Sequence, residues 1–461
     1  MTDLIAWFVA HGLSLTAAQL AAGGLLYAAP LLAIVLPIAG LGQIFERKIA
    51  AAMQRRVGPS TTGIDGVVRF ILGLTMPWLD RAGRVRVADK LLALPPLAFV
   101  NRLATRSGVA QLIADSLKMI GKEDLLPAGV DGLIVRAAPY LALLGAFLPF
   151  VVLPWSQHVQ MADLSIGVLW ILACGGLVVA AIVAAGWGSN NKWSLLGGMR
   201  AVAQIVSYEI PVGLCIAAVV MWTGTMSLQQ MIAAQYQPGI ASFAGWNLVQ
   251  SPFMVLLAVV FFIGALAECQ RTPFDTAEAE SELVSGFNTE LSGLRWGLFA
   301  MAEYTDMFLV CALFAVLFLG GYQSPIGEQW ILSLPVLAES LIHITILIAK
   351  TMIGVWIMMW IRWTLPRFRI DQVMRLAWLK LVPLALIGMF GLAVTMLCSR
   401  TDVVVYGVHA SAISAQPGLA LWALSWIVVG GGTWILVQAA RSAGPAPHPS
   451  LAKLTSLERR T

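Results

Sequence analysis

The sequence predicts an all-α, polytopic membrane protein. Of its 461 residues, 59% are hydrophobic and only 11% are charged. Apolar runs of about 20 residues, the length of a helix that crosses a bilayer, recur along the chain. These runs lack the alternation of a membrane β-barrel, and a helix satisfies its own backbone hydrogen bonds in hydrocarbon. We therefore expect about nine transmembrane helices, at residues 24–44, 135–154, 164–187, 202–222, 252–267, 296–320, 335–361, 381–398 and 418–440.

Basic residues concentrate on alternate connections between these runs. The connections 155–163, 223–251 and 321–334 contain no Lys or Arg, whereas those on the other side hold nearly all of them. By the positive-inside rule, the N-terminus faces outward, and the basic loops and the C-terminus face the cytoplasm. The net charge of +5 is therefore a topology signal. Nucleic-acid binding would need basic residues interleaved with aromatics on a soluble domain, so we expect no nucleic-acid partner.

Three stretches interrupt the alternation of span and loop. Residues 45–59 combine basic and apolar side chains and end at Gly58-Pro59, which predicts an amphipathic helix at the membrane interface. Residues 64–107 hold two apolar pieces that are too short to span, surrounded by basic residues, and predict an interfacial hairpin on the cytoplasmic leaflet. Residues 441–461 are rich in Pro, Ser and charge, which predicts a disordered tail. The opening MTDLIAW lacks the basic region of a signal peptide, so the first span should be retained.

The sequence shows no cofactor motif. The five cysteines lie far apart without a C-x-x-C pair, the five histidines are equally dispersed, and neither a dinucleotide fingerprint nor a phosphate loop occurs. We therefore expect no metal, iron–sulfur cluster or other cofactor to be bound by this chain alone.

The most anomalous feature is the acidic segment 267–290. One quarter of the 24 Asp and Glu residues fall there, between two spans. Crowded carboxylates at the edge of hydrocarbon repel and desolvate one another, which raises pKa values toward neutrality and favours proton exchange. A solvated acidic loop explains the charge equally well on composition alone. If the middle of the segment is helical, Asp275, Glu278 and Glu282 share one face.

Ionisable residues also lie inside the spans, where each costs free energy unless it is paired or hydrated. Structural pairing would account for any one of them. A hydrated, protonatable route from the acidic segment through Glu209 and Glu303 to the middle of the membrane would account for more of them together. The residues concerned are Glu209, Glu303, Asp306, Glu339, His343 and Lys350.

Five blocks of the sequence resemble one family. They read ERKIAAAMQRRVGP, QLIADSLKMIGKEDLLP, SNNKWSLLGGMRAVAQIVSYE, AECQRTPFDTAEAESELVSGF with AEYTDMFLV, and WIRWTLPRFRIDQVM. They look like the blocks of the H subunit of bacterial NADH–quinone oxidoreductase, respiratory complex I, and follow the family's order over most of residues 24–398. The resemblance implies a bundle of eight helices, without cofactors of its own, that joins the peripheral electron-transfer arm to the membrane arm.

The resemblance also implies a function that depends on partners. The substrate would be a lipid quinone such as ubiquinone, and NADH, FMN and iron–sulfur clusters would be bound by other subunits. Expected partners are the peripheral iron–sulfur and quinone-site subunits, the pump subunits of the membrane arm, and the lipid of the bacterial inner membrane. The chain would be an enzyme subunit, inactive alone, with no catalytic residues in isolation.

Residues that match family positions fall into three groups. Proton-coupling positions are Glu209, Glu268, Asp275, Glu278, Glu280, Glu282, Glu290 and Glu303. Quinone-chamber positions are Glu46, Arg47, Arg55, Arg271 and Arg295. Other charged family positions are Asp115, Lys118, Lys122, Glu123, Lys350, Arg362 and Arg367.

The chain departs from the family in several places. Most of residues 64–107 is an insertion, and the ninth span is additional. Thr276-Ala277 stands where Leu-Pro is common, and Asn288 and Leu291 stand where His and Tyr are usual. The implied divisions are a membrane domain at 1–400, an additional span at 401–440 and a tail at 441–461.

Two other functions fit part of the sequence. The corresponding subunit of a membrane-bound hydrogenase or formate hydrogenlyase keeps a similar acidic loop but works without quinone. An autonomous ion transporter would line a pathway of its own, but no inverted repeat supports this alternative. The full RTPFD–EAESELVSG–AEY pattern and the WIRWTLPRFRIDQ block look closer to the quinone enzyme.

Overall fold

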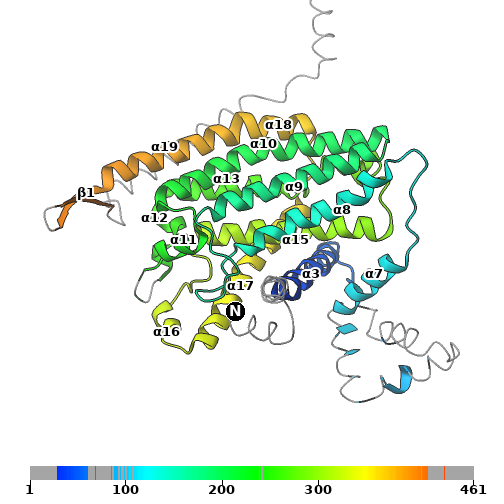
Figure 1. Ribbon diagram of the computed structural model, residues 1–461, viewed down its shortest axis with the longest axis horizontal. Helices are drawn as coiled ribbons and strands as arrows, with labels where there is room; N and C mark the ends of the chain where they lie inside the picture. The colour runs from blue at the N-terminus through cyan, green and yellow to red at the C-terminus, as the bar shows by residue number, and fades with distance from the viewer. Residues whose placement is uncertain are drawn as a thin grey trace, which may run out of the picture.

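The computed structural model describes residues 29–60, isolated positions between 61 and 107, residues 108–405 except 238, 240 and 241, residues 408–413, and residue 430. The expected interfacial hairpin at 64–107 therefore lies almost wholly outside the described residues. The expected ninth span and the tail lie outside them as well, apart from residue 430. Helices make up most of what is described (Figure 1).

Six helical stretches of the described chain are long and apolar enough to cross a membrane. They agree in place with six of the predicted spans, so the chain is a multi-pass helical membrane protein. The shorter α13 (Pro252–Glu268) coincides with the fifth predicted span. The count of nine spans stays a prediction. The six are α8 with η2 (Gly132–Val151), α9 (Gly167–Gly188), α10 (Lys192–Thr223), α15 (Gly293–Phe318), α17 (Val336–Thr364), and Ile370–Leu397, which combines α18 (Ile370–Leu376), η5 (Ala377–Leu381) and most of α19 (Val382–Ser399).

The first described helix differs from its prediction. Helix α3 (Ala29–Met53) runs without a break through residues 45–53, so the expected separate interfacial helix is an extension of the first span. Its buried stripe explains the continuity. Val35, Ala39, Glu46 and Ala50 are all buried and recur at helical spacing, so one face of α3 packs against the bundle along its whole length.

A short hairpin follows the helical bundle. Strand β1 (Arg400–Val405) pairs antiparallel with β2 (Val408–Ile413), with Arg400 opposite Ile413. The run Val403–Val405 is β-branched, which favours an extended backbone over a helix. The hairpin ends before residue 418, where the expected ninth span begins, so that span stays a prediction.

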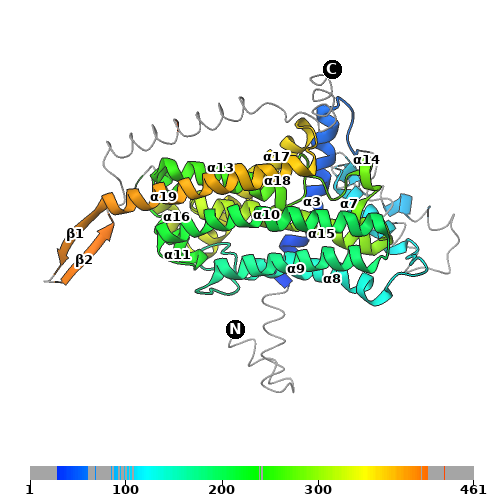
Figure 2. The same cartoon turned by 90° about the horizontal axis from the view of Figure 1, so that it is seen from above.

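The remaining described helices are short. Helices α7 (Val109–Gly121), α11 (Leu228–Ala234), α12 (Asn247–Gln250) and α16 (Glu328–Leu332), with the 3-10 turn η3 (Ser242–Gly245), connect or flank the long ones. Helix α10 is central and packs against α9, α13 and α19, while α15 packs against α3, α8 and α17. Helices α8, α9, α10, α13 and α15 run side by side in both views, whereas α3 crosses them (Figures 1 and 2).

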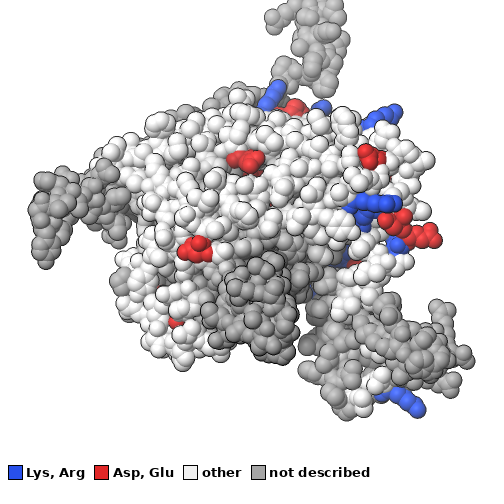
Figure 3. All heavy atoms as spheres, viewed as in Figure 1, with Lys and Arg blue, Asp and Glu red and all other residues white. Residues whose placement is uncertain are grey.

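Charged side chains gather at one end of the bundle, beside a broad uncharged surface (Figure 3). We call this the charged end. It includes Lys192, where α10 begins, and Arg362, in the last turn of α17. A broad uncharged surface with charge gathered at one end is consistent with a protein that spans a bilayer.

Candidate functional site

The acidic segment joins α13 to α15 as a folded loop with little helix. Within it, only α14 (Glu280–Leu283) and the turn η4 (Gly286–Asn288) are helical. Asp275 and Glu278 precede α14, so the helical face expected for Asp275, Glu278 and Glu282 does not form. The backbone at Ala279, with a ψ of 91°, is not helical, so α14 begins only at Glu280, and the positive φ of Val284 ends it.

The loop is held against α10 by a close approach of two glycines. A Cβ atom added to Gly197 would lie 2.6 Å from the Cα atom of Gly286. A Cβ atom on Gly286 would lie 1.8 Å from the carbonyl oxygen of Ala277. Nearby, the Ser194 hydroxyl donates to the carbonyl of Phe287 over 3.2 Å. Only glycine fits at either position of this contact. The contact fixes the loop beside the first turns of α10.

Arg271 is the centre of a buried cluster of charges. Its guanidinium lies 3.5 Å from the Glu303 carboxylate and 3.9 Å from that of Glu46, and it stacks over the Tyr304 ring at 4.4 Å. Glu46 also pairs with Arg362 at 2.5 Å and accepts a 2.7 Å hydrogen bond from the Tyr304 hydroxyl. We call these five residues the Arg271 cluster. Two carboxylates and two guanidinium groups balance one another and join α3, α15, α17 and the acidic segment.

A second layer of acids lies beside the Arg271 cluster. Asp275 is buried and pairs with Arg367 at 2.7 Å. Burial raises the pKa of Asp275, against the opposing effect of Arg367. Burial and then the charge of Asp275 raise the pKa of Glu278, which accepts a hydrogen bond from the Asn288 amide. These carboxyl groups therefore bind protons more readily than exposed ones do.

Two departures from the family pattern supply hydrogen bonds here. Asn288, at a position usually occupied by His, donates to Glu278. Thr276 donates a 2.6 Å hydrogen bond to the side-chain oxygen of Gln204, whose amide donates to the carbonyl of Ala267 over 2.8 Å. The loop therefore remains hydrogen-bonded at both positions.

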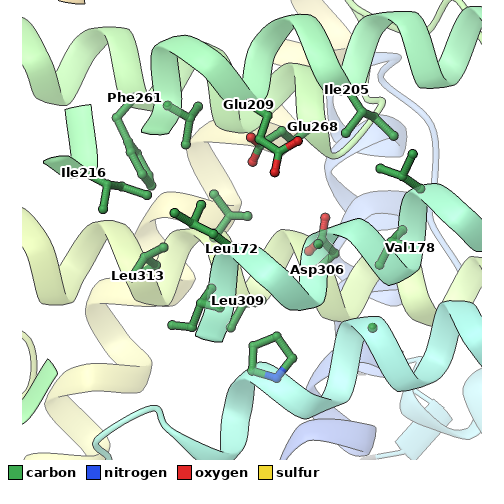
Figure 4. Close-up of a pocket in the computed structure, with 17 residues that line it drawn as sticks. Leu172, Val178, Ile205, Glu209, Ile216, Phe261, Glu268, Asp306, Leu309 and Leu313 are labelled. Atoms are coloured by element: carbon green, nitrogen blue, oxygen red, sulfur yellow. The ribbon is translucent and has the colours of Figure 1, made fainter. Parts of the chain in front are cut away.

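Beyond the Arg271 cluster, two small cavities connect further acids inside the bundle. A cavity of about 30 Å³ is lined by Glu303, Glu268 and Asp306. A second, of about 80 Å³, is lined by Glu268, Asp306 and Glu209. Glu209 and Glu268 project into it from α10 and α13, and Asp306 enters from α15 (Figure 4). Because Glu268 and Asp306 line both cavities, the acids form one sequence from the Arg271 cluster to the middle of α10. Each cavity is large enough for water.

The other predicted acidic positions lie around this core. Glu282 pairs with Arg200 at 2.6 Å, with its side chain half exposed. Glu290 accepts a 2.7 Å hydrogen bond from the Asn191 amide. For Glu280 the structure describes the backbone only, so its predicted role stays a prediction.

The remaining predicted charged positions are either paired with a carboxylate or exposed. Arg47 pairs with Asp115 at 2.7 Å, and Lys118 lies 3.7 Å from the same carboxylate. Arg295 is buried and binds Asp124. Arg55, Lys122 and Glu123 are exposed.

Lys350 lies apart from the site. Its ammonium group donates to the carbonyl oxygens of Leu319, Gly321 and Gln323 at 2.6, 2.9 and 2.7 Å, and sits 4.1 Å from the Trp246 ring centre. The structure therefore separates this predicted position from the acidic sequence. Within the described part of the chain, no group of three His, Cys, Asp or Glu residues is placed to hold a metal ion.

Asp306 was expected among the ionisable residues of the spans, and it lines both cavities. Three other residues of the site were not predicted to belong to it: Tyr304, which lies within the AEYTDMFLV block, Gln204 and Asn288. Gln204 and Asn288 are neutral, and nothing in their sequence surroundings predicts that they hydrogen-bond the acidic segment.

Comparison with known proteins shows clear relatives. Residues 99–393 match the family model described as NADH dehydrogenase. The chain is 43% identical to the H subunit of NADH-quinone oxidoreductase from Anaeromyxobacter dehalogenans, over 62% of this chain and 71% of the relative. It is 38% identical to the protein of that name from Chlorobaculum parvum, over 78% and 89% of the two chains. It is 36% identical to that from Chlorobium luteolum, over 86% and 93%.

Proposed function

The chain belongs to the NADH dehydrogenase family, with the H subunits of bacterial NADH-quinone oxidoreductases as relatives, and on that premise we propose that it forms much of a quinone-binding chamber and couples quinone reduction to proton translocation. It is a membrane subunit of an enzyme complex. The partners we propose are the peripheral subunits that carry FMN and iron–sulfur clusters and the pump subunits of the membrane arm.

One observation carries this proposal. Ionisable side chains run from the charged end, through Asp275, the Arg271 cluster and Glu268, to Glu209 in the middle of α10. A helix bundle that needed only stability would not bury so many acids, because each costs free energy unless it is paired or hydrated. The arrangement supports charge transfer between a site at the membrane edge and the interior.

The chamber would lie at the Arg271 cluster and the residues around it. Glu46 and Arg47 occupy successive positions of α3, one turned to the Arg271 cluster and one to Asp115, so this helix end contributes to both sides. Arg271 and Arg362 would orient the polar head of a quinone, and Tyr304 would hold the Glu46 carboxylate in place.

Coupling would follow from charge. When quinone is reduced by two electrons it takes up two protons, and the electrons would come from a cluster in a partner subunit. A unit charge that moves to about 4 Å from a carboxylate changes its energy by roughly 4 kcal/mol at an effective dielectric near 20. That change is worth about three pKa units. Asp275 and Glu278, whose pKa values burial already raises, would respond by changing protonation.

We propose that the charged end faces the cytoplasm and that the chain lies in the bacterial inner membrane. The concentration of basic residues supports this orientation. A cysteine at exposed Lys122 should react with an impermeant thiol reagent from the cytoplasmic side. A cysteine at Trp330, which is 65% exposed on α16, should react from the opposite side. The reverse labelling pattern would invert the proposed topology.

The names of the relatives favour this proposal over the hydrogenase alternative, because those reported above are NADH-quinone oxidoreductase subunits. Co-purification distinguishes the two. The proposal requires a donor-oxidising arm with iron–sulfur subunits, whereas a hydrogenase requires nickel–iron subunits.

The test of the chamber uses a photoreactive quinone on the assembled complex. We expect it to label peptides from residues 44–60 or 268–279 of this chain, and excess unmodified quinone should suppress the labelling. The isolated chain in lipid should show no NADH oxidation or quinone reduction. Labelling confined to other subunits, or turnover by the chain alone, would contradict the proposal.

A further inference from the structure

A second group of ionisable residues lies far from the charged end. His343 of α17 is fully buried and stands between two buried carboxylates, Glu328 of α16 and Glu339 one turn earlier in α17. Its Nε2 atom lies 3.0 Å from Glu328, and its Nδ1 atom lies 3.8 Å from Glu339. His343 is 19 residues from Arg362, or about 28 Å along a helix, close to the thickness of the hydrocarbon core.

The atoms of this group require a shared proton. Glu328 and His343 use one proton in their 3.0 Å contact. The facing atoms, Nδ1 of His343 and Oε1 of Glu339, are buried and have no hydrogen-bond partner. If Nδ1 carried no proton and Glu339 were ionised, two lone pairs would face each other in a site without water contact. One further proton, on His343 or on Glu339, turns this repulsion into an attraction.

Among the described neighbours of His343, one side leads to solvent. The ring of Tyr322 packs against that of His343 with 4.9 Å between the ring centres, and its hydroxyl accepts a hydrogen bond from Gln229, so this side is closed. Glu328 is held by the backbone amide of Ser324 at 2.6 Å. On the remaining side, the other oxygen of Glu339 lies 3.6 Å from Nε2 of His158, whose side chain is 44% exposed.

We propose that Glu328, His343 and Glu339 form a proton-binding site that exchanges protons, through His158, with the aqueous phase on the side opposite the charged end. Lys350 lies two turns further along α17, where backbone carbonyls hold it in place. The site is separate from the acidic sequence that ends at Glu209 and needs no quinone. A purely structural ion pair between α16 and α17 would bind its proton permanently and would not exchange it with pH.

The test is infrared difference spectroscopy of the assembled complex between two pH values near neutrality, without NADH or quinone. It therefore reports on this site whether or not the proposed coupling function holds. We expect Glu339→Gln and His343→Gln each to remove the same titrating carboxyl and imidazole bands. Thr345→Ser, at a residue of the same helix that carries no ionisable group, is the matched control and should leave the spectrum unchanged.

His158→Gln tests the route. It should remove only the contribution of its own imidazole, keep the bands that Glu339→Gln and His343→Gln remove, and slow the exchange of those bands in deuterated buffer at least about tenfold. If His343→Gln prevents assembly, Glu339→Gln alone decides, because it keeps the imidazole and the size of the side chain. Unchanged pH-difference spectra in Glu339→Gln would overturn the proton site, and unchanged exchange in His158→Gln would overturn its opening to solvent.

Discussion

The Tyr304 hydroxyl donates a 2.7 Å hydrogen bond to the carboxylate of Glu46, a residue 258 positions away in the chain. The Arg271 guanidinium lies over the ring of the same tyrosine. Tyr304 thus contacts an acid through its hydroxyl and a base through its aromatic face.

Tyr304→Phe should lower quinone reduction while the complex still assembles. The ring keeps its contact with Arg271, and Glu46 keeps its pair with Arg362. A hydrogen bond to a charged group contributes about 1.5–3 kcal/mol. We expect the complex to assemble and quinone reduction to fall roughly tenfold, measured as KM and kcat for quinone. Tyr236→Phe, at an exposed tyrosine, is the control, and equal activity of the two variants would remove Tyr304 from the site.

Arg271→Met should destabilise the protein, because it leaves Glu46 and Glu303 with one fewer cation in a buried place. Removing one partner of a buried ion pair costs about 3–5 kcal/mol. The double variant Arg271→Met/Glu303→Gln should recover part of this loss, which a double-mutant cycle of thermal unfolding would detect. Additive effects in the cycle would mean that the two side chains do not interact.

The helices were predictable because a bilayer demands long apolar runs, and such runs are visible in any sequence. The positions at which the helices begin and end were less predictable. Helix α10 begins at Lys192, ten residues before the predicted start at 202, because Asn191 caps it by accepting from the Trp193 amide. Its first turns contain Gly197 and polar residues that pack on the acidic segment. The sequence of these turns is therefore not typical of a membrane-spanning helix.

The acids of the site were predictable as a set, because buried charge is rare in such a chain. Their partners were not, since pairs such as Glu46 with Arg362 depend on how distant helices meet. Lys350 is an example. The sequence placed it only among the ionisable residues of the spans, and in the fold Gly320 and Gly321, both with positive φ, shape the turn whose carbonyl oxygens bind its ammonium group.

Protonation of the acidic segment should make stability depend on pH. Burial raises the folded-state pKa of Asp275 and Glu278 above their usual values of 3.8 and 4.5. The folded state then binds more protons than the unfolded state above those values, so the free energy of unfolding falls as pH rises through the window up to the folded pKa.

Glu278→Gln, which resembles the protonated form, should flatten this part of the dependence of Tm on pH in the detergent-solubilised complex. Glu282→Gln, with a half-exposed side chain, is the matched control. Parallel curves for wild type and Glu278→Gln would contradict the raised pKa of Glu278.

Gly286→Ala should displace the acidic segment. An L-residue at φ +56° costs about 1–2 kcal/mol, and the new Cβ atom would also clash with the Ala277 carbonyl. We expect less assembled complex and faster proteolysis between α13 and α15. Gly213→Ala in α10 has open space around its Cβ position and should be neutral or stabilising. If both variants behave alike, the glycine contact does not fix the loop.

The acidic sequence should matter for coupling more than for folding. Gln replaces Glu at nearly constant volume and removes a protonatable charge, so packing should survive in Glu209→Gln, Glu280→Gln and Glu282→Gln. For Glu209→Gln, which faces a cavity shared with Glu268 and Asp306, we expect quinone reduction and proton uptake to fall at least about tenfold, or about 1.4 kcal/mol in the barrier. Both are measured in membranes matched for complex content, with Glu458→Gln in the tail as the control. If one carboxyl of the proton route is lost, quinone reduction and proton uptake should both fall. Normal turnover in all three variants would mean that the acidic segment has no role in proton coupling.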